Sequence, residues 1–104
     1  MIRWIKSHEE YIEFTKAERA VRTTYFYAPL LDSKEGFAMG ITISKKISNS
    51  VLRNKLKRRV KAWIRENRSI LPNGTKMNLI ARRGVAQLSW DDLSEQLTQL
   101  MGMV

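Results

Sequence analysis

The sequence has no cysteine, a single histidine, two prolines and only ten acidic residues against 19 lysines and arginines. Without cysteine, a disulfide scaffold, a thiolate zinc site and a cysteine nucleophile are all excluded. No run approaches the 18 or more apolar residues of a membrane-spanning helix, and residues 1–6 lack the uninterrupted apolar stretch of a signal peptide. We therefore expect a soluble protein of the cytoplasm.

The chain has 104 residues, of which 43% are hydrophobic, and this size suits one domain over 1–104 with one modest core. The formal net charge of +9 predicts an anionic partner, either a nucleic acid or a membrane surface. A protein nuclease would need clustered carboxylates or an acid–base pair. The lone His8 and the adjacent Asp91 and Asp92, which a helix dipole explains, form no such group. We predict no catalytic residue and no metal site in the protein itself.

The cations are concentrated between Lys45 and Arg68, where ten lysines and arginines accompany one acid, Glu66. On a helical wheel of about 100° per residue, the apolar residues of this segment share one arc. They are Leu52, Leu56, Val60, Trp63 and Ile64. The spacing predicts a helix that packs one face on a core and presents cations on the other. Such an array can replace the counterions of a polyphosphate, so we expect a nucleic acid partner.

The flanking segments predict the other elements. In order, we expect a helix over 8–19 after a Ser7 capping box, strands over 22–31 and 37–44, the basic helix over 50–69, a strand over 76–82 and a helix that follows Ser89. A turn at 32–36 predicts that the first two strands pair as an antiparallel hairpin. The order αββαβα predicts an α+β domain with a small mixed sheet packed by helices.

The second strand alternates bulky residues with Ala38, Gly40 and Thr42. Gly40 allows another backbone or a ligand to approach closely, so we expect one sheet face to lack a cover of bulky side chains. In the first helix, Tyr11 and Phe14 share a face because they are three residues apart. We expect Phe14 in the core.

The segment Ile41–Arg58, ITISKKISNSVLRNKLKR, resembles the signature of the protein subunit of bacterial ribonuclease P. Ile80-Ala81-Arg82 and Ala86–Trp90 are similar to the C-terminal half of that family, in the same order. The resemblance implies a ribosomal protein S5 domain 2-like fold, with a left-handed βαβ crossover around the basic helix against the usual rule.

The resemblance also implies a function. The chain would be the accessory subunit of a ribonucleoprotein that removes the 5′ leader of precursor tRNA by endonucleolytic cleavage. A partner RNA, ribonuclease P RNA, would be the catalyst and would hold most of the Mg²⁺, and no protein partner would be required. The protein would bind the leader and stabilise the RNA subunit and its metal ions.

Site residues follow from the resemblance by position. It implies contacts with the RNA subunit for Ser44, Lys45, Lys46, Asn49, Arg53, Asn54, Lys55, Lys57, Arg58, Lys61 and Arg65. It implies a leader cleft between the first helix and the sheet, formed by Tyr11, Thr15, Tyr25, Tyr27, Gly40 and Thr42, with Tyr25 and Tyr27 on one strand face. Stacking of unpaired bases on aromatic rings supports such a cleft independently. Three positions depart from the family pattern: Lys55 replaces an arginine, Ser48 a glycine and Thr15 an aromatic residue.

Three other functions remain open. A general RNA-binding protein or ribosome-associated RNA chaperone without a cleavage role would use the same helix. A DNA-binding module could read guanine with it, although nothing before the helix resembles the first helix of a helix-turn-helix. A protein bound at a membrane surface is also conceivable, but the strands on both sides of the basic helix favour a packed domain.

Overall fold

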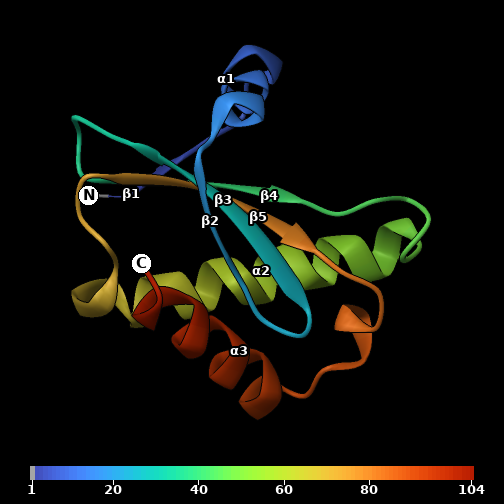
Figure 1. The fold of residues 1–104 in the computed structure, drawn as a ribbon. Coiled ribbons are helices and arrows are strands. Elements are labelled where there is room, and N and C mark those ends of the chain that lie inside the picture. The colour runs from blue at the N-terminus through green and yellow to red at the C-terminus, as the bar shows by residue number, and fades with distance from the viewer. Residues whose placement is uncertain (1) are drawn as a thin grey trace.

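The computed structural model describes residues 2–104. The strands are β1 (Ile2–Trp4), β2 (Arg19–Arg22), β3 (Phe26–Asp32), β4 (Phe37–Thr42) and β5 (Thr75–Ala81). The α-helices are α1 (His8–Glu13), α2 (Ser50–Glu66) and α3 (Trp90–Gly102). Short 3₁₀ turns cover Phe14–Lys16, Arg68–Ile70 and Val85–Gln87. Figure 1 shows α2 and α3 below the sheet and α1 above it.

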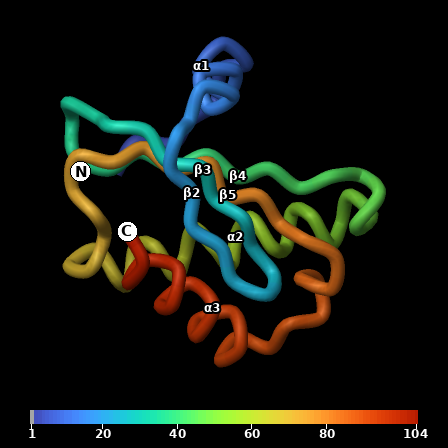
Figure 2. Tube along the Cα trace, viewed as in Figure 1, coloured from blue at the N-terminus to red at the C-terminus, as the bar shows by residue number. Residues whose placement is uncertain are grey.

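The five strands form one mixed sheet in the order β1-β4-β5-β3-β2. β4 runs parallel to β1 and β5, whereas β3 runs antiparallel to β5 and β2. β4 and β5 are thus parallel neighbours joined through α2, and this crossover is left-handed, as the family resemblance implies (Figures 1 and 2). The α+β class, the mixed sheet and its helical cover are confirmed.

The main core lies between the sheet and the pair α2 and α3. Its fully buried large side chains come from the sheet (Phe26, Met39, Met77, Leu79), from α2 (Val60, Trp63, Ile64) and from α3 (Leu93, Leu97, Leu100), with Val85 between. Each buried side chain of this kind stabilises the fold by about 1.5–3 kcal/mol. A second, smaller cluster of Ile5, Phe14 and Ala38 lies on the other face of the sheet, beside α1. Phe14 is therefore a core residue, as expected.

Side-chain caps fix where the helices begin. Asn49 accepts a hydrogen bond from the Leu52 amide at 2.9 Å, and Ser89 accepts one from the Asp92 amide at 3.1 Å. Each cap pairs an amide that has no partner inside its helix. The position of α2, and with it the direction of its cations, is thus set by Asn49 at the end of the loop after β4.

The N-terminal third differs most from the sequence-based expectations. The first helix ends at Glu13 instead of residue 19, and the single strand expected over 22–31 is two strands, β2 and β3. β1 was not expected because a three-residue strand has no measurable periodicity. Compared with the structure, the expected order αββαβα therefore omits β1 and counts β2 and β3 as one strand.

The expected pairing of the first two strands as a hairpin is wrong. β5 lies between β3 and β4, and the hairpin is instead formed by β2 and β3. A turn such as 32–36 reverses the chain but does not fix which strands are neighbours. Leu52, expected on the core-facing arc of α2, is 37% exposed because it lies in the first turn, before the helix reaches the sheet.

Candidate nucleic-acid interface

The solvent face of α2 carries an array of cations. Lys55, Lys57, Arg58 and Arg65 are exposed, together with the amide side chain of Asn54. Within residues 2–104, none of these cations has a carboxylate within 4 Å, because every ion pair found there involves Glu10 or Glu13. The one acid of the helix, Glu66, lies at its last position. This face can therefore bind phosphates without first breaking an internal ion pair.

Two arginines of α2 also serve the fold. Arg53 donates from Nη1 to the carbonyl oxygen of Ser48 at 2.7 Å, and Arg59 donates to that of Leu88 at 2.9 Å. Arg53, predicted to contact the RNA subunit, thus holds the loop before the helix. In that loop the Ser44 hydroxyl accepts from the Lys46 amide at 3.1 Å. The loop keeps Lys45 and Lys46 exposed at the start of the cationic surface.

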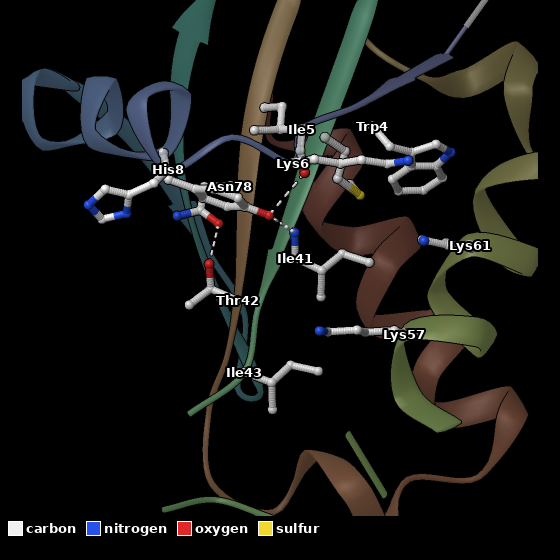
Figure 3. A pocket seen from close by; sticks show the side chains of 12 residues that line it. Trp4, Ile5, Lys6, His8, Ile41, Thr42, Ile43, Lys57, Lys61 and Asn78 are labelled. Atoms are coloured by element: carbon white, nitrogen blue, oxygen red, sulfur yellow. Dashed lines mark hydrogen bonds between the residues drawn. The ribbon is translucent and has the colours of Figure 1, made fainter. Parts of the chain in front are cut away.

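A cavity of about 700 Å³ lies between α1, the edge of β4 and α2 (Figure 3). We call it the cleft. Its lining residues are Trp4, Ile5, Lys6, His8, Tyr11, Met39, Ile41, Thr42, Ile43, Lys57, Lys61 and Asn78. The lining therefore combines aromatic and aliphatic surface with three lysines, which is the chemistry that a base joined to a phosphate requires.

Tyr11 fixes how α1 lies on the sheet. Its hydroxyl donates to the carbonyl oxygen of Ile5 at 3.2 Å and accepts from the Ile41 amide at 3.1 Å. The Ile5 amide still pairs with the Met39 carbonyl oxygen at 2.8 Å. The Tyr11 hydroxyl therefore links the segment after β1 to β4 at the point where the backbone hydrogen bonds between them end. A Cβ at Gly40 would lie 2.6 Å from Cε1 of Tyr11, and only glycine leaves room for the ring.

Lysines of α2 form the opposite side of the cleft. Lys57 and Lys61 line it, and Lys61 Nζ lies 5.3 Å from the centre of the Trp4 ring, a cation–π distance. Figure 3 shows Lys57 extending from α2 toward Ile41 and Ile43 of the β4 edge, and the Lys61 amine near Trp4. Lys57 and Lys61 were predicted to contact the RNA subunit, yet they border the cavity that Tyr11 closes.

Ion pairs hold α1 in place. Glu10 accepts from Arg3 Nη1 at 2.8 Å and lies 3.1 Å from Lys76 Nζ, which is also 3.7 Å from Glu13. The hydrogen bond from Arg3, helped by Lys76, lowers the pKa of Glu10 to about 2. The expected capping box is therefore half formed: Ser7 accepts from the Glu10 amide at 3.2 Å, but the Glu10 carboxylate is engaged by Arg3 and Lys76.

The residues predicted for leader binding do not all lie at one site. Tyr11 and Thr42 line the cleft, with Gly40 beneath the Tyr11 ring. Thr15 does not line it, and its hydroxyl donates to the Ile12 carbonyl oxygen at 2.8 Å. Tyr27 does not line the cleft, but it is partly exposed and in register with Ile80 and Thr42, so the three lie in one row across the sheet.

The expectation that Tyr25 and Tyr27 share a strand face is wrong. Tyr25 precedes β3, its amide donates to Oε1 of Gln96 at 3.2 Å, and its ring lies against Gly84. Tyr25 thus packs toward α3, on the far side of the sheet from α1. The turn between β2 and β3 shifts it out of the strand, and a run of β-forming residues does not reveal such a turn.

Sequence reasoning missed Trp4, Lys6 and Asn78 as cleft residues. Trp4 and Lys6 belong to a segment too short to be recognised as a strand. Asn78 carried a usable signal, because an amide in the apolar run Met77–Ala81 is unusual in a central strand. In residues 2–104, no group of three His, Cys, Asp or Glu side chains is placed to hold a metal ion. No helix among them is long and apolar enough to cross a membrane.

Comparisons with known proteins agree with this architecture. The family model for ribonuclease P matches residues 3–104. The ribonuclease P protein component of Desulforapulum autotrophicum is 34% identical over 88% of this chain and 79% of its own length. That of Bacillus cereus strain AH187 is 30% identical over 89% of this chain and 83% of its own length.

Two solved structures have the same fold. The ribonuclease P protein of Thermotoga maritima superposes with a TM-score of 0.89 at 20% identity, over 98% of this chain and 97% of its own. The Staphylococcus aureus protein gives 0.86 at 24% identity, over 96% and 93%. The family match extends over nearly the whole chain, including the basic helix and the cleft. The chain therefore belongs to the ribonuclease P protein family, whose members act with an RNA subunit in the maturation of tRNA 5′ ends.

Proposed function

We propose that the whole chain acts as one RNA-binding domain, with α2 holding ribonuclease P RNA and the cleft holding the leader of the precursor tRNA. One observation carries this proposal: Lys57 and Lys61 border the cleft, while Arg58 and Arg65 of the same helix face solvent. A single rigid helix can therefore bind one RNA and guide the adjacent single strand of another.

The solvent face of α2 supplies affinity for the RNA subunit. Lys55, Arg58 and Arg65 are exposed, and they are followed along the surface by Lys45 and Lys46 of the loop. Each phosphate contact releases a condensed counterion, so binding weakens steeply as salt rises. The cap at Asn49 and the bond from Arg53 to the loop keep these charges in fixed relative positions.

The cleft supplies contacts to unpaired nucleotides. Its volume of about 700 Å³ lies in the range of ordinary small-ligand sites, so it can take nucleotides of a single strand but no duplex. Tyr11 and Trp4 offer aromatic surface, and Lys6, Lys57 and Lys61 offer charge for the phosphates. Tyr27 lies outside the cleft lining, with its ring centre 5.6 Å from Arg22 Cζ, and offers a further exposed aromatic and cationic surface for nucleotides beyond the cleft.

Magnesium enters this proposal through the RNA. Mg²⁺ prefers clustered oxygen ligands, and residues 2–104 offer no group of three carboxylates or histidines, so the side chains do not fit a resident ion. The lysines and arginines of α2 instead reduce repulsion between phosphates and so favour the metal-bound RNA. We place this function in the cytoplasm, where precursor tRNA is made.

The first test is single-turnover cleavage of a precursor tRNA by a bacterial ribonuclease P RNA at low magnesium concentration, with and without the protein. Strong stimulation is expected, because phosphate neutralisation and leader binding matter most when divalent cations are scarce. Tight, salt-sensitive binding to many RNAs without stimulation would instead indicate a general RNA-binding protein.

Two substitutions separate the two surfaces. Arg58→Gln is expected to weaken association with the RNA subunit and to reduce the slope of log K against log salt by about 1. Lys34→Gln, which removes the same charge from the turn before β4, is the control and should leave that slope nearly unchanged. Tyr11→Ala is expected to reduce the preference for precursor over mature tRNA by about 5- to 150-fold, the value of one stacked base. An unchanged preference would show that Tyr11 does not contact the leader.

A further inference from the structure

Asn78 is a buried polar residue without an obvious structural role. It lies on the central strand β5 with only 8% of its surface exposed, between Met77 and Leu79, which point into the main core. Its side chain lies on the opposite face, where it lines the cleft. Aliphatic residues would pack at such a position without the loss of hydration that an amide suffers.

Only the oxygen end of the Asn78 side-chain amide is bonded to another residue. Thr42 Oγ1 donates to Oδ1 of Asn78 at 2.8 Å, and this bond fixes the orientation of the carboxamide. Within residues 2–104, Nδ2 of Asn78 has no hydrogen-bond partner in the protein, and it is not among the fully buried unpaired side-chain atoms, so it is accessible to solvent. Figure 3 shows the nitrogen end of the amide turned away from Thr42. An amide whose oxygen is fixed by Thr42 and whose N–H groups stay accessible at the wall of the cleft can donate to an acceptor on a ligand.

We propose that Asn78, oriented by Thr42, reads the identity of one leader base in the cleft and favours a base that presents a keto oxygen, uracil or guanine. This inference rests on the proposed function, because it requires the leader to lie in the cleft. It adds sequence selectivity to a site whose stacking and charge contacts are indifferent to the base.

The chemistry of the bases gives the direction of the preference. Uracil O4 and guanine O6 are acceptors and can receive the N–H groups of Asn78. Cytosine and adenine carry an amino group at the corresponding positions, which would bring two donors together. Since Oδ1 already accepts from Thr42, the nitrogen end is the part of the amide left to discriminate. Such a mismatch costs free energy because the bound base displaces the water that would otherwise pair with the facing donors.

The test uses the reconstituted holoenzyme and precursor tRNAs in which each leader position in turn carries U, G, A or C. Cleavage of pairs of substrates in competition gives the ratio of their kcat/KM values. The wild-type protein should favour U and G over A and C by about tenfold at one leader position, which corresponds to about 1.4 kcal/mol. Asn78→Leu should bring that ratio close to one, and Thr42→Val should reduce it. Asn73→Ala, in the turn before β5, is the control and should keep the wild-type ratio.

A second variant makes the result independent of folding defects in the first. Asn78→Asp, which lacks the N–H groups, should shift the preference toward A and C. Equal kcat/KM values for substrates with each of the four bases at every leader position, with precursor still preferred over mature tRNA, would overturn the inference and leave the proposed function intact. A wild-type ratio that persists in Asn78→Leu or in Asn78→Asp would also overturn it. Loss of any preference for precursor over mature tRNA in the wild type would overturn both.

Discussion

The two faces of the sheet differ in how they are covered. On one face, α2 and α3 enclose an apolar core with side chains such as Trp63, Phe26 and Leu97 fully buried. On the other face, the six-residue α1 has no buried residue and is held by a phenol and a few ion pairs. The stability of the domain therefore comes mainly from the face covered by α2 and α3. The other can therefore keep a cavity and an unpaired amide open to a ligand.

The largest expected difference between the faces is in stability. Trp63 is 1% exposed, and its indole nitrogen donates to Ser94 Oγ at 2.9 Å. Trp63→Ala should lower the free energy of unfolding by about 3–5 kcal/mol, because it opens a cavity and leaves Ser94 unpaired. Urea denaturation followed by circular dichroism measures this value.

Trp90→Ala is the matched control for that substitution. Trp90 is 39% exposed at the first position of α3, so its removal should change the free energy of unfolding by no more than about 1 kcal/mol. Similar losses for the two tryptophans would contradict the assignment of stability to the face covered by α2 and α3.

An intermediate effect is expected where α1 meets the sheet. In Gly40→Ala the new methyl group would meet the Tyr11 ring at 2.6 Å, so the ring must move and its hydroxyl must leave Ile5 and Ile41. We expect a loss of about 1–3 kcal/mol in the free energy of unfolding. The preference of the holoenzyme for precursor over mature tRNA should fall as well, because the cleft changes shape. Both quantities are measurable on the same protein preparation.

Gly102→Ala makes the same chemical change in open space. No atom lies within 4 Å of a Cβ at that position, the last residue of α3. Stability should stay constant or rise by up to about 1 kcal/mol, since alanine favours helix over glycine. If Gly40→Ala behaved like Gly102→Ala, the close packing of Tyr11 on β4 would be refuted.

The sequence predicted the closed face better than the open one. The basic helix could be located because Leu56, Val60, Trp63 and Ile64 repeat at helical spacing, and all four are buried in the structure. The same periodicity revealed that its other face is charged. Long amphipathic elements carry enough repeats to specify their length and the face that they bury.

The open face depends on features that local patterns do not encode. β1 has three residues, and Tyr25 was assigned to a strand that a turn divides. β5 becomes the neighbour of β4 through the crossover formed by α2, and no turn motif in the sequence predicts this pairing. Tyr11 and Gly40 were recognised as candidates, but their contact joins residues 29 positions apart and follows only from the folded chain. The cleft thus had to be seen in the structure, whereas the helix beside it could be read from the sequence.

The smallest expected effect concerns the ion pairs of α1. Glu10 has a pKa lowered to about 2 by Arg3 and Lys76, below its usual value of 4.5. A carboxyl group with a lowered pKa in the folded state stabilises the fold above its unfolded pKa, and this contribution disappears as pH falls toward the folded value. Arg3 is 43% exposed, so solvent screens much of the pair, and we expect a contribution of only about 1 kcal/mol.

Glu10→Gln should therefore be less stable than the wild type by about 1 kcal/mol at pH 7. The difference should shrink between about pH 5 and pH 2, as the wild-type carboxylate takes up its proton. Denaturation curves of both proteins across this range measure it, with Glu9→Gln as the exposed neighbour that forms no ion pair within residues 2–104. A difference that stays constant down to pH 2 would mean that charge does not hold α1 on the sheet. The open face would then be held by the Tyr11 hydroxyl and the small cluster around Phe14 alone, and Gly40→Ala, which displaces Tyr11, should detach α1 more completely.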